Sequence, residues 1–120
     1  MKNIAILGAS PKPHRFAYKC QHKLQAHGYV PKPVAKKGGV IDGIDCVTSL
    51  RDLTEDIDTV TVYINATLMS EVIEDVIKIA PRRVIFNPGT ESRKHQQRLE
   101  AEGIQVLNAC TLILLDNDQF

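Results

Sequence analysis

The hydrophobic positions of this sequence fall into short continuous runs separated by longer stretches with helical spacing. The runs at residues 4–7, 29–34, 59–64, 83–86 and 104–107 are mainly apolar or β-branched and have the length of buried strands. Helices are expected at residues 15–26, at residues 91–102 and around Met69, Ile73 and Val76, whose side chains recur at intervals of three and four. Strand and helix therefore alternate almost to the end of the chain.

This alternation predicts the fold class and the place of two elements. It is typical of an α/β fold: a single-domain, Rossmann-like, doubly wound parallel sheet of about five strands with helices on both faces, over residues 1–120. Pro31 and Pro33 interrupt the second run, and proline is tolerated best at a sheet edge, so we expect this strand away from the centre. Residues 36–43 have the composition of a glycine-rich loop, Ser49 is expected to cap a short helical turn, and Pro81 to end the helix that contains Met69.

Composition and charge exclude several classes of protein. The 120 residues are 43% hydrophobic and 24% charged, as in an ordinary soluble domain, and the net charge of +1 argues against a nucleic-acid binder with a broad basic surface. No leader or bilayer-length apolar run is present, so we expect no membrane association and a cytoplasmic location. Cys20, Cys46 and Cys110 lack CxxC spacing, which argues against a disulfide framework or a zinc ribbon.

Polar and basic residues follow every expected strand. Ligands of open parallel sheets bind at the carboxyl ends of the strands, where the strand order reverses. The segments that leave those ends are residues 8–15, 35–39, 65–67, 87–91 and 108–111, and each contains Gly, Asn, Ser, Thr or a cation. The sequence therefore predicts one composite binding site along this edge of the sheet.

The first loop has the features of a phosphate-binding turn. Gly8 matches the first glycine of the G-x-G-x-x-G fingerprint, but Ser10 and Pro13 stand where the other two would be. Backbone amides of residues 8–10 beside a helix N-terminus are expected to bind an anion, with Lys12 and Arg15 adding charge. The alternative is a proline-stiffened connection whose cations are solvated.

The end of the second strand distinguishes between cofactors. An NAD enzyme usually carries Asp or Glu there to bind the ribose 2′-hydroxyl, whereas this chain has Val34-Ala35-Lys36-Lys37. Lysine at this point favours a ligand with a ribose phosphate, NADP or coenzyme A, over NAD. The alternative is a surface turn whose lysines face water.

The loop after the fourth strand is compact. Gly89 can adopt a left-handed conformation, Thr90 is a candidate helix N-cap, and Glu91 would oppose the positive end of the next helix. A purely structural turn needs the same residues, so Asn87 and Gly89 are site candidates through their position at the carboxyl edge.

Five segments carry a family resemblance: residues 6–13 (Ile-Leu-Gly-Ala-Ser-Pro-Lys-Pro), 28–34, 59–63, 85–91 (Ile-Phe-Asn-Pro-Gly-Thr-Glu) and 103–112. With these segments the chain resembles, over nearly its full length, the small stand-alone CoA-binding domain proteins. These in turn are similar to the nucleotide-binding domain of the succinyl-CoA synthetase α subunit. The resemblance implies a Rossmann-like fold that binds coenzyme A through its pyrophosphate and its phosphorylated adenosine.

The resemblance also implies roles for particular residues. It assigns the pyrophosphate to Gly8, Ala9 and Ser10, with Lys12 and Arg15 as cations, and the adenosine to Val34, Ala35 and Lys36, while Tyr63 and Ile64 flank the ligand. The chain departs from the family where Val34-Ala35-Lys36 replaces the common Val-Asn-Pro, which weakens the assignment of the adenosine contacts. We expect no acyl-CoA synthetase activity, because the domain that carries the synthetase's phosphorylated histidine is absent.

Few residues are candidates for chemistry. The histidines lack metal-site spacing and are expected on the solvated surface; they are His14, His22, His27 and His95. No G-x-S-x-G motif occurs, although a Ser–His–Asp arrangement stays open. Cys110, after the fifth strand, is the best candidate for a reactive residue: it is either a small buried apolar side chain or forms a mixed disulfide with the thiol of bound coenzyme A.

The sequence thus predicts a protein that binds coenzyme A or an acyl-CoA at the carboxyl edge of its sheet, as a binding or regulatory module rather than as an enzyme. One alternative is an NADP-dependent oxidoreductase or a subunit of one. Another is an interaction subunit of a larger complex. The apolar residues 111–115 either cover the last edge of the sheet or pair with a second subunit, and the latter predicts a homodimer.

Overall fold

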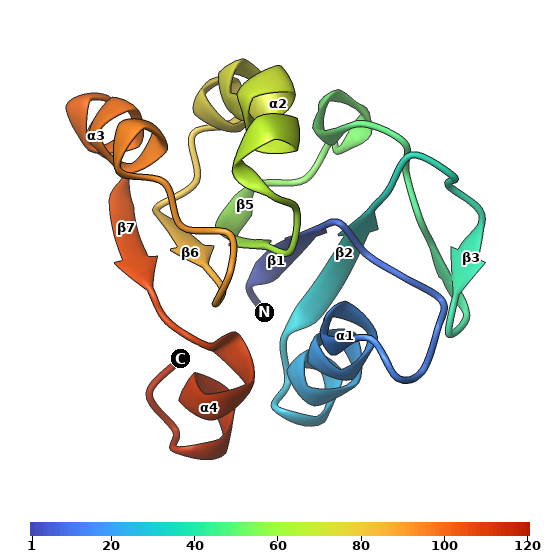
Figure 1. Ribbon diagram of the computed structural model, residues 1–120. Helices are drawn as coiled ribbons and strands as arrows, with labels where there is room; N and C mark the ends of the chain where they lie inside the picture. Colours follow the sequence, from blue (N-terminus) through green and yellow to red (C-terminus); the bar gives the residue numbers. More distant parts are fainter.

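A computed structural model describes residues 1–120 and contains a five-stranded parallel sheet in the order β2-β1-β5-β6-β7 (Figure 1). The strands are β1 (Asn3–Leu7), β2 (Val30–Val34), β5 (Ile57–Val62), β6 (Arg83–Phe86) and β7 (Gln105–Asn108). The helices are α1 (Phe16–Ala26), α2 (Ala66–Ile79), α3 (Arg93–Ala101) and α4 (Thr111–Asp116), with a 3-10 turn, η1 (Leu50–Asp52). The predicted α/β fold class is confirmed.

The helices cover both faces of the sheet because its strands are buried on both sides. Ile4 and Ile6 of β1 pack with Ala17, Cys20 and Leu24 of α1 and Leu115 of α4. The alternate residues of β1, Ala5 and Leu7, pack with a second cluster that includes Met69, Ile73 and Val76 of α2 and Leu99 of α3. Figure 1 shows the resulting three layers, with α1 and α4 below the sheet and α2 and α3 above it.

The strand order reverses between β1 and β5. The chain passes from β1 to its neighbour β2 on one side and then returns to the other side of β1 to form β5. Ligands of such sheets bind where neighbouring connections lead to opposite faces, so the carboxyl ends of β1 and β5 are the expected site. The proline-containing β2 lies at the edge of the sheet, as predicted.

Two segments differ from their expected structure. The loop expected at residues 36–43 contains part of a small antiparallel hairpin, β3 (Val40–Ile41) and β4 (Ile44–Asp45), whose turn residues Asp42 and Gly43 both have positive φ. An Asp-Gly pair between apolar residues is a known hairpin signal that the loop interpretation missed. Residues 111–115 lie in α4, which contacts α1 and buries Leu115, so they do not cover the edge strand β7. Pairing of this segment with a second subunit, through its exposed Ile113, stays a prediction.

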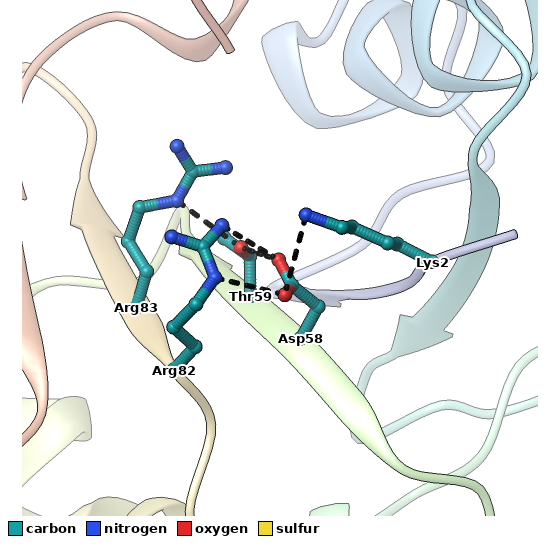
Figure 2. Close-up of polar contacts among 5 residues, drawn as sticks. All are labelled: Lys2, Asp58, Thr59, Arg82 and Arg83. Atoms are coloured by element: carbon teal, nitrogen blue, oxygen red, sulfur yellow. Dashed lines mark hydrogen bonds and ion pairs between the residues drawn. The ribbon is translucent and has the colours of Figure 1, made fainter.

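An ion-pair network joins the strands at the amino end of the sheet, opposite the expected site. Figure 2 shows Arg82 in a bidentate pair with Asp58, at 3.0 and 3.1 Å, with Lys2 3.9 Å from the same carboxylate. The hydroxyl of Thr59 donates to Asp58 at 2.7 Å and accepts a 3.1 Å hydrogen bond from Nε of Arg83. These contacts fix the starts of β1, β5 and β6 relative to one another.

No helix in the structure has the length and apolar character that crossing a bilayer requires.

Candidate functional site

A cleft of about 500 Å³ opens at the carboxyl ends of β1, β2 and β5, beside the start of α1. Its walls come from the loop after β1, the segment after β2 and the ends of β5 and β6. The residues that line it are Gly8, Ala9, Ser10, Pro11, Lys12, Arg15, Phe16, Ala17, Ala35, Lys36, Lys37, Gly38, Ile41, Tyr63, Pro88 and Thr90. The cleft therefore lies at the reversal of strand order, where the fold predicts a ligand.

Gly8 allows β1 and β5 to end side by side at the floor of the cleft. Its φ is +93°, and a Cβ atom there would lie 2.8 Å from Cγ2 of Ile64 and 3.1 Å from the carbonyl carbon of Tyr63. The amides of Gly8 and Ala9 both donate to the carbonyl oxygen of Val34, at 3.0 and 3.1 Å. Gly8 thus allows the two backbones to approach closely. The amides of Gly8 and Ala9 already have an acceptor in the fold, and binding of an anion by residues 8–10 stays a prediction.

Anion-binding amides are instead available at the start of α1. The first turn of a helix has N–H groups without intrahelical acceptors, and a side chain at the N-cap usually accepts from one of them. Asn65 and Ser92 do this for α2 and α3, whereas the N-cap of α1, Arg15, makes no such bond and no acidic residue lies in the first turn. Phe16 and Ala17 of this turn line the cleft, so its positive end faces the cleft.

Four cations surround the cleft. Lys12 and Arg15 come from the loop after β1, and Lys36 and Lys37 follow β2. None of the four takes part in the seven ion pairs of the protein, and no carboxylate lines the cleft. At the amino end of the sheet, by contrast, Lys2 and Arg82 share Asp58. Four cations without an acidic partner thus lie around one cleft, which suits a ligand with several phosphate groups.

Comparison with known proteins identifies the family. Residues 2–116 match the family described as CoA binding domain. The chain belongs to this family. The resemblance noted in the sequence is thereby confirmed.

This CoA-binding domain is also similar to individual proteins. It is 28% identical over 112 residues to the acetate–CoA ligase (ADP-forming) I subunit alpha of Pyrococcus furiosus, which covers 82% of this chain but 24% of that protein. The chain therefore spans about a quarter of the length of this curated relative. A crystal structure of an uncharacterized protein matches 100% of this chain and 98% of its own, with 38% identity and a TM-score of 0.95. A hypothetical protein from Pyrococcus horikoshii OT3 has 31% identity and a TM-score of 0.91, over 97% of this chain and 82% of its own.

Most of the residues predicted for the site line the cleft of the CoA-binding domain, and the others are outside its lining. Val34 is buried beneath the first loop, and Ile64 packs partly buried above Gly8. Gly89 has the left-handed φ of +91° in the turn after β6, and its amide donates to Glu91. Cys110 is half-buried at the N-cap of α4.

Asn87 is buried and its side chain is fully used by the fold. Its amide nitrogen donates to the hydroxyl of Thr61 at 2.7 Å and to the carbonyl of Val62 at 2.9 Å, and its oxygen accepts from the amide of Thr111 at 2.9 Å. Asn87 therefore fixes β5, β6 and the start of α4. The expected N-cap role of Thr90 is wrong: its hydroxyl donates to the carbonyl of Asn87, and Ser92 caps α3.

Tyr63 lines the cleft with a side chain whose far end is buried. Its hydroxyl is buried without a hydrogen-bond partner, beside the thiol of Cys20, and burial raises the pKa of Tyr63. Burial also raises the pKa of the Cys20 thiol to about 12, so Cys20 is protonated at neutral pH. Cys110 is the least buried cysteine of the CoA-binding domain.

The expectation that all four histidines lie on the solvated surface is wrong for His95. Its side chain is buried between α3 and α2, with Nε2 2.9 Å from the carbonyl oxygen of Ala66 and 3.2 Å from the hydroxyl of Ser70. A carbonyl can only accept, so Nε2 carries the proton and cannot act as a base towards Ser70. This Ser–His contact is structural. The sequence around His95 is polar and did not indicate that the side chain would be buried.

Sequence reasoning missed several residues that line the cleft, among them Phe16 and Ile41. Phe16 is the first residue of α1 and belongs to no motif, so nothing in the sequence indicated that it lines the cleft. Ile41 reaches the cleft through the hairpin that the Asp42-Gly43 pair could have indicated. Lys37 was already present in the basic segment after β2 and belongs with Lys36.

Proposed function

We propose that this protein binds coenzyme A or an acyl-CoA in the cleft, as a cytoplasmic binding or regulatory module rather than as an enzyme. The observation that carries the proposal is the set of four unpaired cations around an uncapped helix N-terminus at the reversal of strand order. Membership of the CoA binding domain family supports the choice of ligand.

The cleft would bind the ligand mainly through its phosphates. The free amides at the start of α1 and the side chains of Lys12 and Arg15 suit the pyrophosphate, because donors to a charged oxygen each contribute about 1.5–3 kcal/mol. Lys36 and Lys37, at the end of β2, suit a phosphate on the ribose. NADP carries such a phosphate as well, so the basic segment alone does not separate it from coenzyme A, and membership of the CoA binding domain family is what favours coenzyme A.

The residues around the cleft favour binding over catalysis. Its titratable side chains are four cations and Tyr63, whose buried phenol stays protonated. The P. furiosus relative is named as a subunit of an acetate–CoA ligase, and this chain aligns with about a quarter of it. We therefore propose the ligand, and not the ligase reaction, for this protein.

A thermal-shift series with coenzyme A, acetyl-CoA, NADP, NAD and ATP tests the proposal. A ligand at a hundred times its Kd stabilises the native state by roughly 2.7 kcal/mol, which raises Tm by several degrees. We expect stabilisation by coenzyme A and acetyl-CoA. Stabilisation by NADP alone would replace the proposal with an oxidoreductase role. No response to any nucleotide would favour a subunit that binds a protein partner.

Charge variants test the site itself. Replacing Lys36 and Lys37 together with alanine is expected to weaken coenzyme A more than dephospho-CoA, because the latter lacks the ribose phosphate. Lys94→Ala, on α3, is the matched control, since it removes an exposed lysine away from the cleft. Equal losses in the double variant and in Lys94→Ala would contradict the assignment of the site.

A further inference from the structure

Phe16 has an aromatic side chain that is exposed to solvent. It is 66% exposed, and the other exposed large hydrophobic residues are Met1, Val40 and Ile113. Of these four, Phe16 is the one that lines the cleft. A phenyl ring exposed at this level contributes little to the core, although aromatic side chains gain much free energy when their faces are covered.

The surroundings of Phe16 fit one part of a nucleotide. Its backbone belongs to the uncapped first turn of α1, where a phosphate would bind, so its ring lies within the reach of a nucleoside attached to that phosphate. Lys19 lies over the ring, 5.5 Å from its centroid. Ala35 after β2 and Ile41 of the β3–β4 hairpin, which is 2% exposed, form an apolar wall of the same cleft, while its cations come before Phe16 and after Ala35.

The hairpin is held in place from α1. The side-chain nitrogen of Gln21 donates to the carbonyl oxygen of Ile41 at 2.9 Å, and His22 lies 3.2 Å from the carboxylate of Asp42. Gln21 is buried and follows Phe16 by five residues on the same helix. The apolar wall formed by Ile41 therefore keeps a fixed position relative to the start of α1, where Phe16 lies.

We propose that the ring of Phe16 stacks on the purine base of the bound nucleotide and makes the site favour ligands that carry such a base over ligands that lack it. This inference rests on the proposed function and specifies how the base is recognised. Stacking on an exposed ring needs no hydrogen-bond donors, so the neighbouring cations and amides remain free for the phosphates. Phe16 thereby provides a stacking surface for the base at the end of α1 where the phosphate would bind.

Calorimetric titration of three variants tests the proposal. Phe16→Ala is expected to weaken the binding of coenzyme A and of adenosine 3′,5′-bisphosphate by roughly 5- to 100-fold, which is the effect of removing an aromatic side chain that stacks on a base. Binding of 4′-phosphopantetheine, which has no base, is expected to stay within about twofold, on the same reasoning. Phe16→Leu, which keeps apolar bulk but lacks an aromatic face, should weaken binding almost as much. Val40→Ala is the matched control, because Val40 is 62% exposed on the hairpin but does not line the cleft.

Phe16→Trp gives a direct optical signal, since the protein contains no tryptophan. We expect this variant to bind coenzyme A as tightly as the natural protein and its fluorescence to be quenched by the adenine ligands but not by 4′-phosphopantetheine. Unchanged affinity for coenzyme A in Phe16→Ala, or equal loss for ligands with and without the base, would refute the stacking while leaving the proposed function intact. Failure of the natural protein to bind coenzyme A would refute both.

Discussion

Gly8 is the residue whose replacement tests the geometry of the site most directly. In Gly8→Ala, the new Cβ would lie 2.8 Å from Cγ2 of Ile64 and 3.1 and 3.2 Å from the carbonyl carbon and oxygen of Tyr63, at a φ of +93°. Both the positive φ and the steric overlap oppose folding. Gly103→Ala provides the matched comparison, since Gly103 has a φ of +77° after α3 and a Cβ there meets nothing within 4 Å.

The two variants separate the conformational cost from the steric cost. A positive φ in a non-glycine residue costs about 1–2 kcal/mol, which is the whole effect expected for Gly103→Ala. Overpacking in Gly8→Ala adds about 1–3 kcal/mol, because the carbonyl of Tyr63 belongs to the backbone and cannot turn aside. The free energy of unfolding should therefore fall by about 2–5 kcal/mol in Gly8→Ala.

Urea denaturation measures both values, with the m-value as a check that unfolding stays two-state. Removing the closest atom, in the double variant Gly8→Ala/Ile64→Ala, should cost less than the sum of the single changes, because the two side chains compete for the same space. If Gly8→Ala and Gly103→Ala lose the same stability, or if the double variant is additive, the close approach of β1 and β5 is not what requires glycine at position 8.

Three further predictions concern other parts of the molecule. His95→Ala should lower the free energy of unfolding in urea by about 1–3 kcal/mol, since it removes a buried hydrogen-bonded side chain, while calorimetry should show unchanged affinity for coenzyme A; a loss of affinity would contradict a purely structural role. The pKa of Asp58 is held below its ordinary value of 3.8 by the hydrogen bonds from Arg82, so the stability that Asp58 contributes is present above that pH and is lost as the pH falls through the lowered pKa. Acid unfolding should accordingly show a shallower loss of stability in Asp58→Asn than in the natural protein, and identical profiles would refute the contribution of this carboxylate. Incubation with CoA disulfide should add one CoA to Cys110, as its thiolate attacks the disulfide and releases one CoA thiol; intact-mass analysis should show a reducible adduct that is absent in Cys110→Ser, and an adduct that persists in this variant would refute the assignment.

The order and type of most elements could be predicted from the sequence because they depend on local patterns. β6 has the predicted bounds, and β2 lies at the sheet edge that its prolines indicated. The limits of other strands shifted by one or two residues: β5 was expected at 59–64 and spans Ile57–Val62. In a parallel sheet both faces are buried, so a continuous apolar run shows that a strand exists but not where its hydrogen bonds begin.

The candidate site was less predictable because its chemistry depends on which groups the fold has already paired. The loop after β1 was recognisable as a turn, but the fold directs the amides of Gly8 and Ala9 to Val34 and leaves those of α1 free. His95 resembled a surface histidine in a polar segment, and the packing of α3 on α2 buries it. Such pairings join residues far apart in the chain, so no local pattern records them.

By itself, the sequence determined an alternating α/β chain, a turn at Gly8 suited to the end of a buried strand, and basic residues after the first two strands. The tertiary structure decided that these basic residues lie around one cleft without acidic partners, that Gly8 serves the contact between β1 and β5, and that Phe16 stands exposed beside the anion site. The physical reason is the range over which each property is determined. Hydrophobic periodicity depends on residues a few positions apart. The charges and hydrogen-bond donors that a site can offer to a ligand are those that long-range contacts of the fold leave without a partner.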